Sequence, residues 1–389
     1  MRVSSIEDSR FKADSPRRIE EGEDRAMRAA IRLARRGFGT THPNPRVGAV
    51  LLREGGIVGE GFHARAGEAH AEARALAAAG SRARGSTLVA TLEPCAHHGR
   101  TPPCADAIVS AGVRRVVLGM RDPNPLVNGR GVARLRAAGI EVVEDVRGAE
   151  CRELNRPYLK HLATGLPWVM LKSMISLDGR VAADSGDSRG LGGGSEQRLC
   201  HRLRAEHDAV LVGIGTVLAD DPELTVRLVR GRSPVRVVLD TDLRTPAGSR
   251  LVMTAGSVPL AVATASEDRA RIEALERRGV SIWRFARSPE GRVPIRRVLS
   301  RLAAEGRLSI LVEGGPTVHS AFLSEGLADR VAIGIAPLIL GGSKTPGWTR
   351  DLGRKGVGDA IEVGPLVMRR VGRDLWVEGA LGASEAGRV

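Results

Sequence analysis

Aromatic residues are scarce in this chain of 389 residues, where they make up 3% of the sequence with a single tyrosine. Proteins that bind single-stranded nucleic acid commonly stack bases on aromatic rings, and this sequence offers few of them. The formal net charge is +14, but the basic residues are spread along the whole chain without a dense block. We therefore expect no nucleic-acid partner, and we assign the excess charge to a compositional bias and to a phosphorylated small molecule.

Long apolar runs are absent as well. No segment approaches the roughly 18 apolar residues that a membrane-spanning helix needs, and the polar N-terminus lacks the apolar core of a secretory signal. The four cysteines are too few for a disulfide scaffold in a chain of this length. These absences predict a cytoplasmic protein with no membrane partner, whose residues 1–22 form a disordered extension. Cys151 and Cys200 stand in no metal-binding motif and are expected to be buried or idle thiols.

Strand-like and helical patterns alternate from residue 23 onward. VGAVLL, STLVATLEP and RRVVLGM are typical of buried strands, and AHAEARALAAAG and RGVARLRAAG are typical of helices. A seam containing a glycine and a proline ends near residue 165, and a second alternating series follows it, with strands such as DAVLVGIG, VRVVLD and SILVEGG. This alternation indicates an α/β layer fold with helices on both faces of a sheet. We predict two unlike α/β domains, at residues 23–165 and 166–389.

One histidine, one glutamate and two cysteines stand where a metal site would form. His70 and Glu72 open a predicted helix, Cys95 follows the end of a strand, and Cys104 lies at the start of the next helix. Imidazole and thiolate are ligands that zinc prefers, and three of them leave a fourth position for water. Bound zinc lowers the pKa of that water towards 7, and Glu72 is placed to carry a proton from the water to a departing amine. The pattern therefore predicts hydrolytic deamination of an amino-pyrimidine, as in base deaminases with H-x-E and P-C-x-x-C.

Eight residues, 96–103, separate the two cysteines, where tRNA and cytidine deaminases have two. With this longer loop, the stretches THPNPRVGAV, GFHARAGEAHAEARAL, TLEPCAHHGRTPPCADAI and RDPNPLVNGRG closely resemble the deaminase half of the RibD family, the bifunctional deaminase–reductases of riboflavin biosynthesis. The resemblance implies a cytidine-deaminase-like three-layer α/β/α domain in which His70, Cys95 and Cys104 bind zinc and Glu72 transfers the proton. It also implies a substrate pocket lined by Asn44, His98, Arg100, Asp122 and Asn124.

Each of these pocket residues also has a plainer interpretation. Asn44 and Asn124 lie in Asn-Pro turns, where an asparagine commonly caps the turn itself. His97 and His98 are as consistent with a solvated loop as with a substrate contact. Arg100 suits the 5′-phosphate of a ribotide, because a guanidinium binds a phosphate through two parallel hydrogen bonds.

In the second half, ILVEGGPTVHSAFL has the form of a strand that runs into two glycines and then a helix. Glycines let a phosphate approach the backbone, and a helix N-terminus offers N–H donors, although a structural turn would have the same sequence. GIGTVL lacks the third glycine of a dinucleotide-binding fingerprint. Residues alone thus leave the cradle and the turn equally supported.

This half resembles the RibD reductase domain, whose fold is similar to dihydrofolate reductase and whose hydride donor is NADPH. The resemblance implies cofactor contacts by Thr216, Asp220, Gly315, Pro316, Thr317, Val318, His319, Ser320 and Ala321. It implies substrate contacts by Ser188, Arg204, Leu224, Arg227 and Glu313. Lys172 and Asp178 are expected to have a pocket or structural role. Gly190 replaces the tryptophan that the family usually carries, which predicts a more flexible loop and leaves a weakened or lost reductase open.

The sequence thus predicts two successive reactions. The first is zinc-dependent deamination of 2,5-diamino-6-(5-phosphoribosylamino)pyrimidin-4(3H)-one, and the second is NADPH-dependent reduction of the ribosyl group of 5-amino-6-(5-phosphoribosylamino)uracil to ribityl. A nucleic-acid base deaminase with an accessory domain is one alternative. A scaffold with structural zinc is another, although structural sites have four protein ligands and no fourth is evident. A homo-oligomer is left open.

Overall fold

The computed structural model describes residues 20–97, 102–342 and 344–382. Within them the chain forms two compact units, one of residues 20–36 and 47–154, the other of residues 37–46 and 155–382. The units thus change at residues 154–155, ahead of the boundary near 165 that the sequence predicts, because helix α6 (Arg156–Thr164) packs on strand β6 (Trp168–Ser176) of the second unit. Residues 1–19 of the predicted N-terminal extension lie outside the described residues, and Glu21 begins the first helix.

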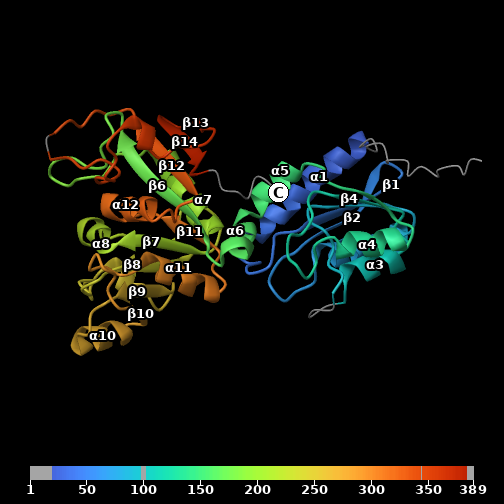
Figure 1. Ribbon diagram of the computed structural model, residues 1–389, viewed down its shortest axis with the longest axis horizontal. Coiled ribbons are helices and arrows are strands. Elements are labelled where there is room, and N and C mark those ends of the chain that lie inside the picture. Colours follow the sequence, from blue (N-terminus) through green and yellow to red (C-terminus); the bar gives the residue numbers. More distant parts are fainter. Residues whose placement is uncertain (1–19, 98–101, 343, 383–389) are drawn as a thin grey trace, which may run out of the picture. The chain divides into compact units, whose positions relative to one another are not determined.

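The first unit is built on a five-stranded sheet in the order β2-β1-β3-β4-β5. Strand β1 pairs antiparallel with β2 and β3, whereas β3, β4 and β5 run parallel. The strands are β1 (Gly48–Arg53), β2 (Gly56–Phe62), β3 (Thr87–Ala90), β4 (Arg115–Leu118) and β5 (Glu141–Val143). The helices (Figure 1) are α1 (Glu21–Ala34), α2 (Ala71–Ala79), α3 (Cys104–Ser110), α4 (Arg130–Ala137) and α5 (Gly148–Leu154), with the 3-10 turns η1 (Arg35–Gly37) and η2 (Gly80–Ala83).

Two glycines of β2 bring helix α2 against the sheet. A Cβ atom at Gly59 would lie 2.3 Å from the carbonyl oxygen of Ala75, and one at Gly61 would lie 2.3 Å from that of Ala71. Any side chain at either position would therefore push the helix away. Because His70 and Glu72 lie at the start of α2, this close packing fixes where both side chains stand.

The second unit is built on a nine-stranded sheet in the order β10-β9-β8-β7-β11-β6-β12-β14-β13. All the strands from one edge of the sheet, β10, through to β12 in this order run parallel to one another. Strand β14 then pairs antiparallel with β12, and β13 pairs antiparallel with β14 at the other edge. Besides β6 they are β7 (Ala209–Gly213), β8 (Val235–Leu239), β9 (Leu260–Thr264), β10 (Val280–Arg284), β11 (Ser309–Val312), β12 (Arg330–Ala336), β13 (Val367–Val371) and β14 (Asp374–Ala380). Besides α6 the helices are α7 (Gly194–Glu206), α8 (Ile214–Asp220), α9 (Arg250–Met253), α10 (Arg269–Glu276), α11 (Ile295–Ala304) and α12 (Pro316–Ser324), with the 3-10 turn η3 (Val357–Asp359).

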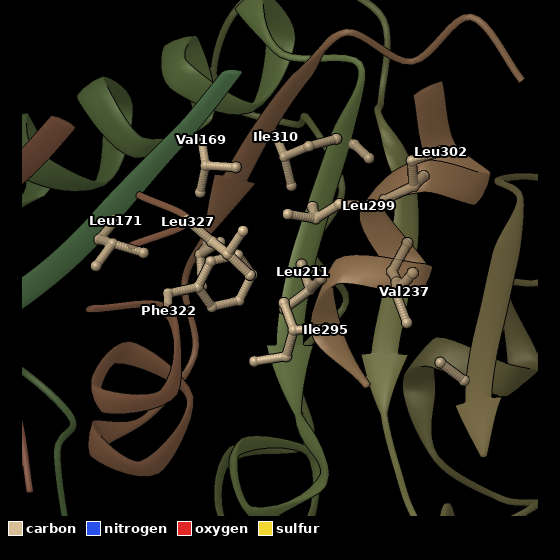
Figure 2. Close-up of a cluster of buried hydrophobic side chains, with 14 of the residues drawn as sticks. Val169, Leu171, Leu211, Val237, Ile295, Leu299, Leu302, Ile310, Phe322 and Leu327 are labelled. Carbon is tan, nitrogen blue, oxygen red and sulfur yellow. The ribbon is translucent and has the colours of Figure 1, made fainter. Parts of the chain in front are cut away.

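Both faces of this sheet are covered, because alternate residues of each strand point to opposite sides. On one face Leu211 and Ile310 pack against α11 and α12. Figure 2 shows Ile295, Leu299 and Leu302 of α11 directed at the sheet beside these strands. On the other face the neighbouring residues of the same strands pack against α7, α8, α9 and α10. The predicted fold class, two unlike α/β domains with helices on both sheet faces, is confirmed.

The sequence does not predict helix α8, because IGTVLAD is too short to show a helical period. The predicted strand DAVLVGIG therefore ends earlier than expected, at Gly213, and α8 begins at the next residue, Ile214. In the part of the chain that the structure describes, no helix is both long and apolar enough to cross a lipid bilayer.

Candidate active sites

Three of the predicted zinc ligands meet at one point in the first unit. The Nδ1 atom of His70 lies 3.3 Å from Sγ of Cys104 and 3.6 Å from Sγ of Cys95. The backbone N–H of Cys104 donates to Sγ of Cys95 at 3.4 Å, so that the start of α3 holds the loop thiol in place. The ligand atoms of all three residues lie within 4.8 Å of one another.

These distances suit a tetrahedral zinc ion. Zinc–sulfur bonds of about 2.3 Å and zinc–nitrogen bonds of about 2.05 Å place neighbouring ligand atoms roughly 3.5 Å apart. The two thiols also influence each other's ionisation. The hydrogen bond between the sulfurs, and then the one from His70, lowers the pKa of Cys95. The same contact between the sulfurs, together with burial, raises the pKa of Cys104. The two sulfurs can both be ionised at this distance only with a cation between them, and the residues fit the metal.

Glu72 stands beside these ligands without being one of the three. Its side chain is buried, 3% exposed, in the first turn of α2. Burial raises the pKa of Glu72 to about 7, since the charged carboxylate loses its hydration there. A buried carboxylate that exchanges a proton near neutral pH has the property that general acid–base catalysis requires.

Two buried residues that the sequence analysis did not single out support this site. The ring of His63 packs edge-on against the ring of His70, with centroids 5.5 Å apart, and its Nδ1 bonds to the carbonyl oxygen of Ala69 at 3.3 Å. Glu93, two residues before Cys95, is 3% exposed. Its position in TLEPC, at a strand end beside a ligand, was the one available signal.

The carboxylate of Glu93 accepts three backbone hydrogen bonds. They come from the N–H groups of Asp122 at 3.3 Å, Gly129 at 3.0 Å and Val132 at 3.1 Å. Gly129 is the N-cap of α4, in the left-handed region at φ +78°, and Val132 is the third residue of that helix. Glu93 thus caps α4 from a distant part of the chain and fixes the loop that carries the predicted pocket residues Asp122 and Asn124.

Of the residues predicted to line the deaminase pocket, the structure places two in one loop of the first unit. Asp122 is buried and its carboxylate accepts from the N–H of Asn124, and the Asn124 side chain accepts from the N–H of Leu126 at 3.0 Å. The turn-capping role is therefore seen for Asn124. Asn44 lies in the segment of residues 37–46, which groups with the second unit. His98 and Arg100 lie outside the described residues.

The second unit contains a cleft of about 970 Å³ at the ends of its parallel strands. Eight of the nine predicted cofactor residues line it, namely Thr216, Asp220, Gly315, Pro316, Thr317, Val318, His319 and Ala321. Ser320 does not, and its hydroxyl accepts instead from the backbone N–H of Arg350. Of the predicted substrate residues, Ser188 and Glu313 line the cleft.

Two glycine turns form the middle of the cleft, where β7 leads into α8 and β11 leads into α12. A Cβ atom at Gly213 would lie 2.7 Å from a methyl carbon of Val318, and one at Gly314 would lie 2.8 Å from its Cβ. Both positions therefore exclude a side chain. At both positions the space is filled by Val318, so close packing of the two turns requires glycine there. The turns also line the cleft, and each leads into a helix N-terminus, which can bind a phosphate. The turns therefore have a structural role and are also placed to contact a ligand.

Buried ion pairs flank these turns on the β6 side. Nζ of Lys172 lies 2.8 Å from Oε1 of Glu196, and the guanidinium of Arg204 makes a two-pronged contact with Glu313 at 2.7 and 2.8 Å. The thiol of Cys200 also donates to Glu196 at 2.7 Å. Lys172, Glu196 and Glu313 line the cleft, whereas Arg204 acts on it through Glu313.

The remaining predicted residues have other surroundings. Leu224 is 3% exposed in an apolar cluster, and Arg227 pairs with Glu223 and bonds the Thr225 hydroxyl at 2.5 Å. Neither Leu224 nor Arg227 is among the described residues that line the cleft. Asp178 accepts from the N–H groups of residues 340 and 341, and so fixes the chain beyond β12.

Gly190, at the position of the family's usual tryptophan, lines the cleft at φ +78°. Its carbonyl oxygen accepts from Nη2 of Arg373 at 2.9 Å, and the following Leu191 is 6% exposed. At the position of the missing tryptophan, the wall of the cleft is therefore formed by the loop backbone, which Arg373 contacts, next to the buried Leu191. The Gly190 loop is thus joined at this point to the turn between β13 and β14.

Comparison with known proteins gives matches over both units. Residues 20–120 match the family described as the cytidine and deoxycytidylate deaminase zinc-binding region, and residues 167–377 match the RibD C-terminal domain. The chain is 41% identical to the riboflavin biosynthesis protein RibD of Aquifex aeolicus, covering 92% of this chain and 98% of that protein. It is 42% identical to the RibD protein of Escherichia coli, covering 90% and 96%.

Solved structures agree with these matches. RibD of Acinetobacter baumannii superposes with a TM-score of 0.81 at 35% identity, covering 93% of this chain and 99% of that one. A diaminohydroxyphosphoribosylaminopyrimidine deaminase/5-amino-6-(5-phosphoribosylamino)uracil reductase from Thermotoga maritima superposes with a TM-score of 0.80 at 36% identity, with the same coverage.

Proposed function

Since this chain belongs to the RibD family, we propose that its zinc-ligand cluster and its glycine-turn cleft are the two active sites of one enzyme. The protein is a bifunctional deaminase and reductase of riboflavin biosynthesis, and its cofactors are Zn²⁺ and NADPH. The predicted function and cofactors are thereby confirmed. The residue roles that follow are our proposal.

In the deaminase site, His70, Cys95 and Cys104 hold the zinc ion, which supplies a bound water of lowered pKa when present. Glu72 receives a proton beside the metal and delivers it to the amine that leaves the pyrimidine ring. Asp122 shapes the ring pocket from a loop that Glu93 fixes. The observation that carries this proposal is a buried carboxylate left unused next to three ligand atoms at tetrahedral spacing.

In the reductase site, the turns at Gly213 and Gly314 accommodate the pyrophosphate of NADPH, which supplies the hydride when bound. Lys172, Glu196 and Glu313 surround the ribosyl end of the substrate, and Arg204 orients Glu313. The four charges form two ion pairs, so this polar wall is rigid without a net charge. The unbroken cradle and the fixed Gly190 loop support an active reductase rather than a lost one.

The phosphorylated pyrimidine is the partner that these sites support, with neither nucleic acid nor membrane required. A cytoplasmic location belongs to the same proposal.

Ammonia release from the diaminopyrimidinone ribotide tests the deaminase half. Glu72→Gln removes the proton carrier but no metal ligand, so we expect zinc content to stay at the wild-type level while ammonia release falls about 10²- to 10⁴-fold. NADPH oxidation with the deaminated ribotide should be unchanged. Glu60→Gln, at an exposed position of β2, is the matched control. Undiminished ammonia release by the Glu72 variant would contradict the proposed role.

A further inference from the structure

The strand order of the second unit fixes the direction in which an extended dinucleotide crosses the cleft. Strands β7 and β11 are neighbours, with β8 beyond β7 and β6 beyond β11. All four run parallel, so their carboxyl ends share one edge of the sheet, the usual place for a ligand in such folds. The glycine turns after β7 and β11 therefore form the centre of the cleft, and β6 and β8 form its two flanks.

The β6 flank holds the polar wall of Lys172, Glu196 and Glu313, which we assign to the substrate. The nicotinamide must reach that substrate, because hydride passes directly between them. With the pyrophosphate at the central turns, the adenosine half of NADPH then extends towards β8. This assignment rests on the proposed function of the cleft.

The β8 flank is rich in arginine. Arg244 follows β8, and Arg287 and Arg292 lie on the loop between β10 and α11, and all three line the cleft. Arg287 is already engaged, since it donates to Asp242 at 2.6 Å and to the carbonyl oxygen of Gly291 at 2.8 Å. The exposed Arg244, in contrast, makes no hydrogen bond or ion pair with any residue that the structure describes.

The charge of Asp242, on the same flank, also bears on which dinucleotide the cleft binds. A carboxylate at the end of a strand beside the adenosine ribose normally binds the 2′-hydroxyl of NADH and repels a 2′-phosphate. Here Asp242 is neutralised by its ion pair with Arg287. The flank thus combines a carboxylate that is paired with Arg287 and a guanidinium that has no partner among the residues the structure describes.

We propose that Arg244 binds the 2′-phosphate of NADPH and is the residue that makes the reductase prefer NADPH to NADH. A guanidinium contacts a phosphate through two parallel charge-assisted hydrogen bonds, which no ribose hydroxyl reproduces. Arg292, on the same flank of the cleft, adds positive charge. The Arg287–Asp242 pair keeps the carboxylate from opposing the phosphate.

Equilibrium binding of two nicotinamide-free probes to the full chain tests this assignment. Adenosine 2′,5′-bisphosphate carries the 2′-phosphate, and 5′-AMP does not. For Arg244→Ala we expect titration calorimetry to show a loss of affinity for the bisphosphate of about 10-fold or more, and less than about 2-fold for 5′-AMP. Arg244→Lys should be intermediate, because it keeps the charge and loses the planar fork.

Arg202→Ala is the matched control, since this exposed arginine of α7 lies outside the cleft and the variant loses the same charge. It should bind both probes as the wild type does. Equal weakening of both probes by Arg244→Ala, or no weakening of either, would overturn the inference. Wild-type protein that binds neither probe would instead reject the proposed cofactor cleft itself, so the two failures are distinguishable. Thermal unfolding of each variant verifies that it is folded, and Arg244→Lys decides the matter if Arg244→Ala is not.

Discussion

Replacing Glu93 separates the positioning of the deaminase pocket from its chemistry. The carboxylate contacts neither the zinc ligands nor the reacting groups in our assignment, but it accepts three backbone hydrogen bonds from the 122–132 region. Oε2 accepts from the N–H groups of Asp122 and Gly129, and Oε1 accepts from that of Val132. In Glu93→Gln, one of these oxygens becomes an N–H₂ donor, so at least one backbone N–H faces a donor.

The magnitude follows from that arrangement. A buried donor left without an acceptor costs about 1–3 kcal/mol, and losing the negative charge at the N-terminus of α4 costs about 0.3–1 kcal/mol. We therefore expect Glu93→Gln to lower the free energy of unfolding of the first unit by about 1–4 kcal/mol. Glu93→Ala leaves three donors without an acceptor and should cost more.

Function should change in a specific way. Because the loop carrying Asp122 loses its anchor, KM for the pyrimidine ribotide should rise while zinc content stays at the wild-type level. Hydrogen exchange of the amides at residues 122, 129 and 132 should accelerate, which a general loss of stability would not confine to these positions. Glu60→Gln again provides the control. Wild-type exchange rates and KM in Glu93→Ala would refute the reasoning.

Two further predictions concern the metal and the second unit. Chelation of zinc, or Cys104→Ala, should abolish ammonia release and leave NADPH oxidation with the deaminated ribotide intact, because the cleft of the second unit contains none of the ligands; loss of both activities would contradict this. Asp208→Asn should destabilise the second unit by about 3–5 kcal/mol at pH 7, as measured by urea unfolding. Burial opposes the ionisation of Asp208, yet His42, the Ser309 hydroxyl and Arg232 hold its pKa well below the usual range. The carboxylate therefore stabilises the fold above its unfolded pKa of about 4 and loses this effect as the pH falls below it, so the difference from the wild type should shrink in acid.

The zinc cluster was predictable from the sequence because metal chemistry restricts both residue type and setting. Only imidazole and thiolate groups at helix starts and strand ends suited the ion, and His70, Cys95 and Cys104 occur in such places. The alternating strands were equally predictable, since burial on both faces of a sheet makes them almost wholly apolar. In both cases the signal lies within a few neighbouring residues.

Features that depend on distant residues escaped the sequence. The partners of Glu93 lie 29 to 39 positions away, and no local pattern announces which backbone groups a buried carboxylate will meet. Arg204 is predicted to contact substrate, and the sequence does not show that it pairs with Glu313, 109 positions away. Leu224, predicted to contact substrate, is buried with φ +54°, and neither fact is visible in LTVR.

Glu72 and Glu93 show how two buried carboxylates, both 3% exposed in the same unit, come to serve opposite purposes. The carboxylate of Glu93 accepts three backbone hydrogen bonds, so its position is fixed. For Glu72, burial outweighs the stabilisation that its own backbone N–H offers, and its pKa rises to about 7. The oxygens of Glu93 accept from backbone donors of the 122–132 region, whereas Glu72 is buried beside the three ligand atoms. Position beside the metal ligands, together with a pKa near neutrality, therefore distinguishes the proposed catalyst from the structural carboxylate.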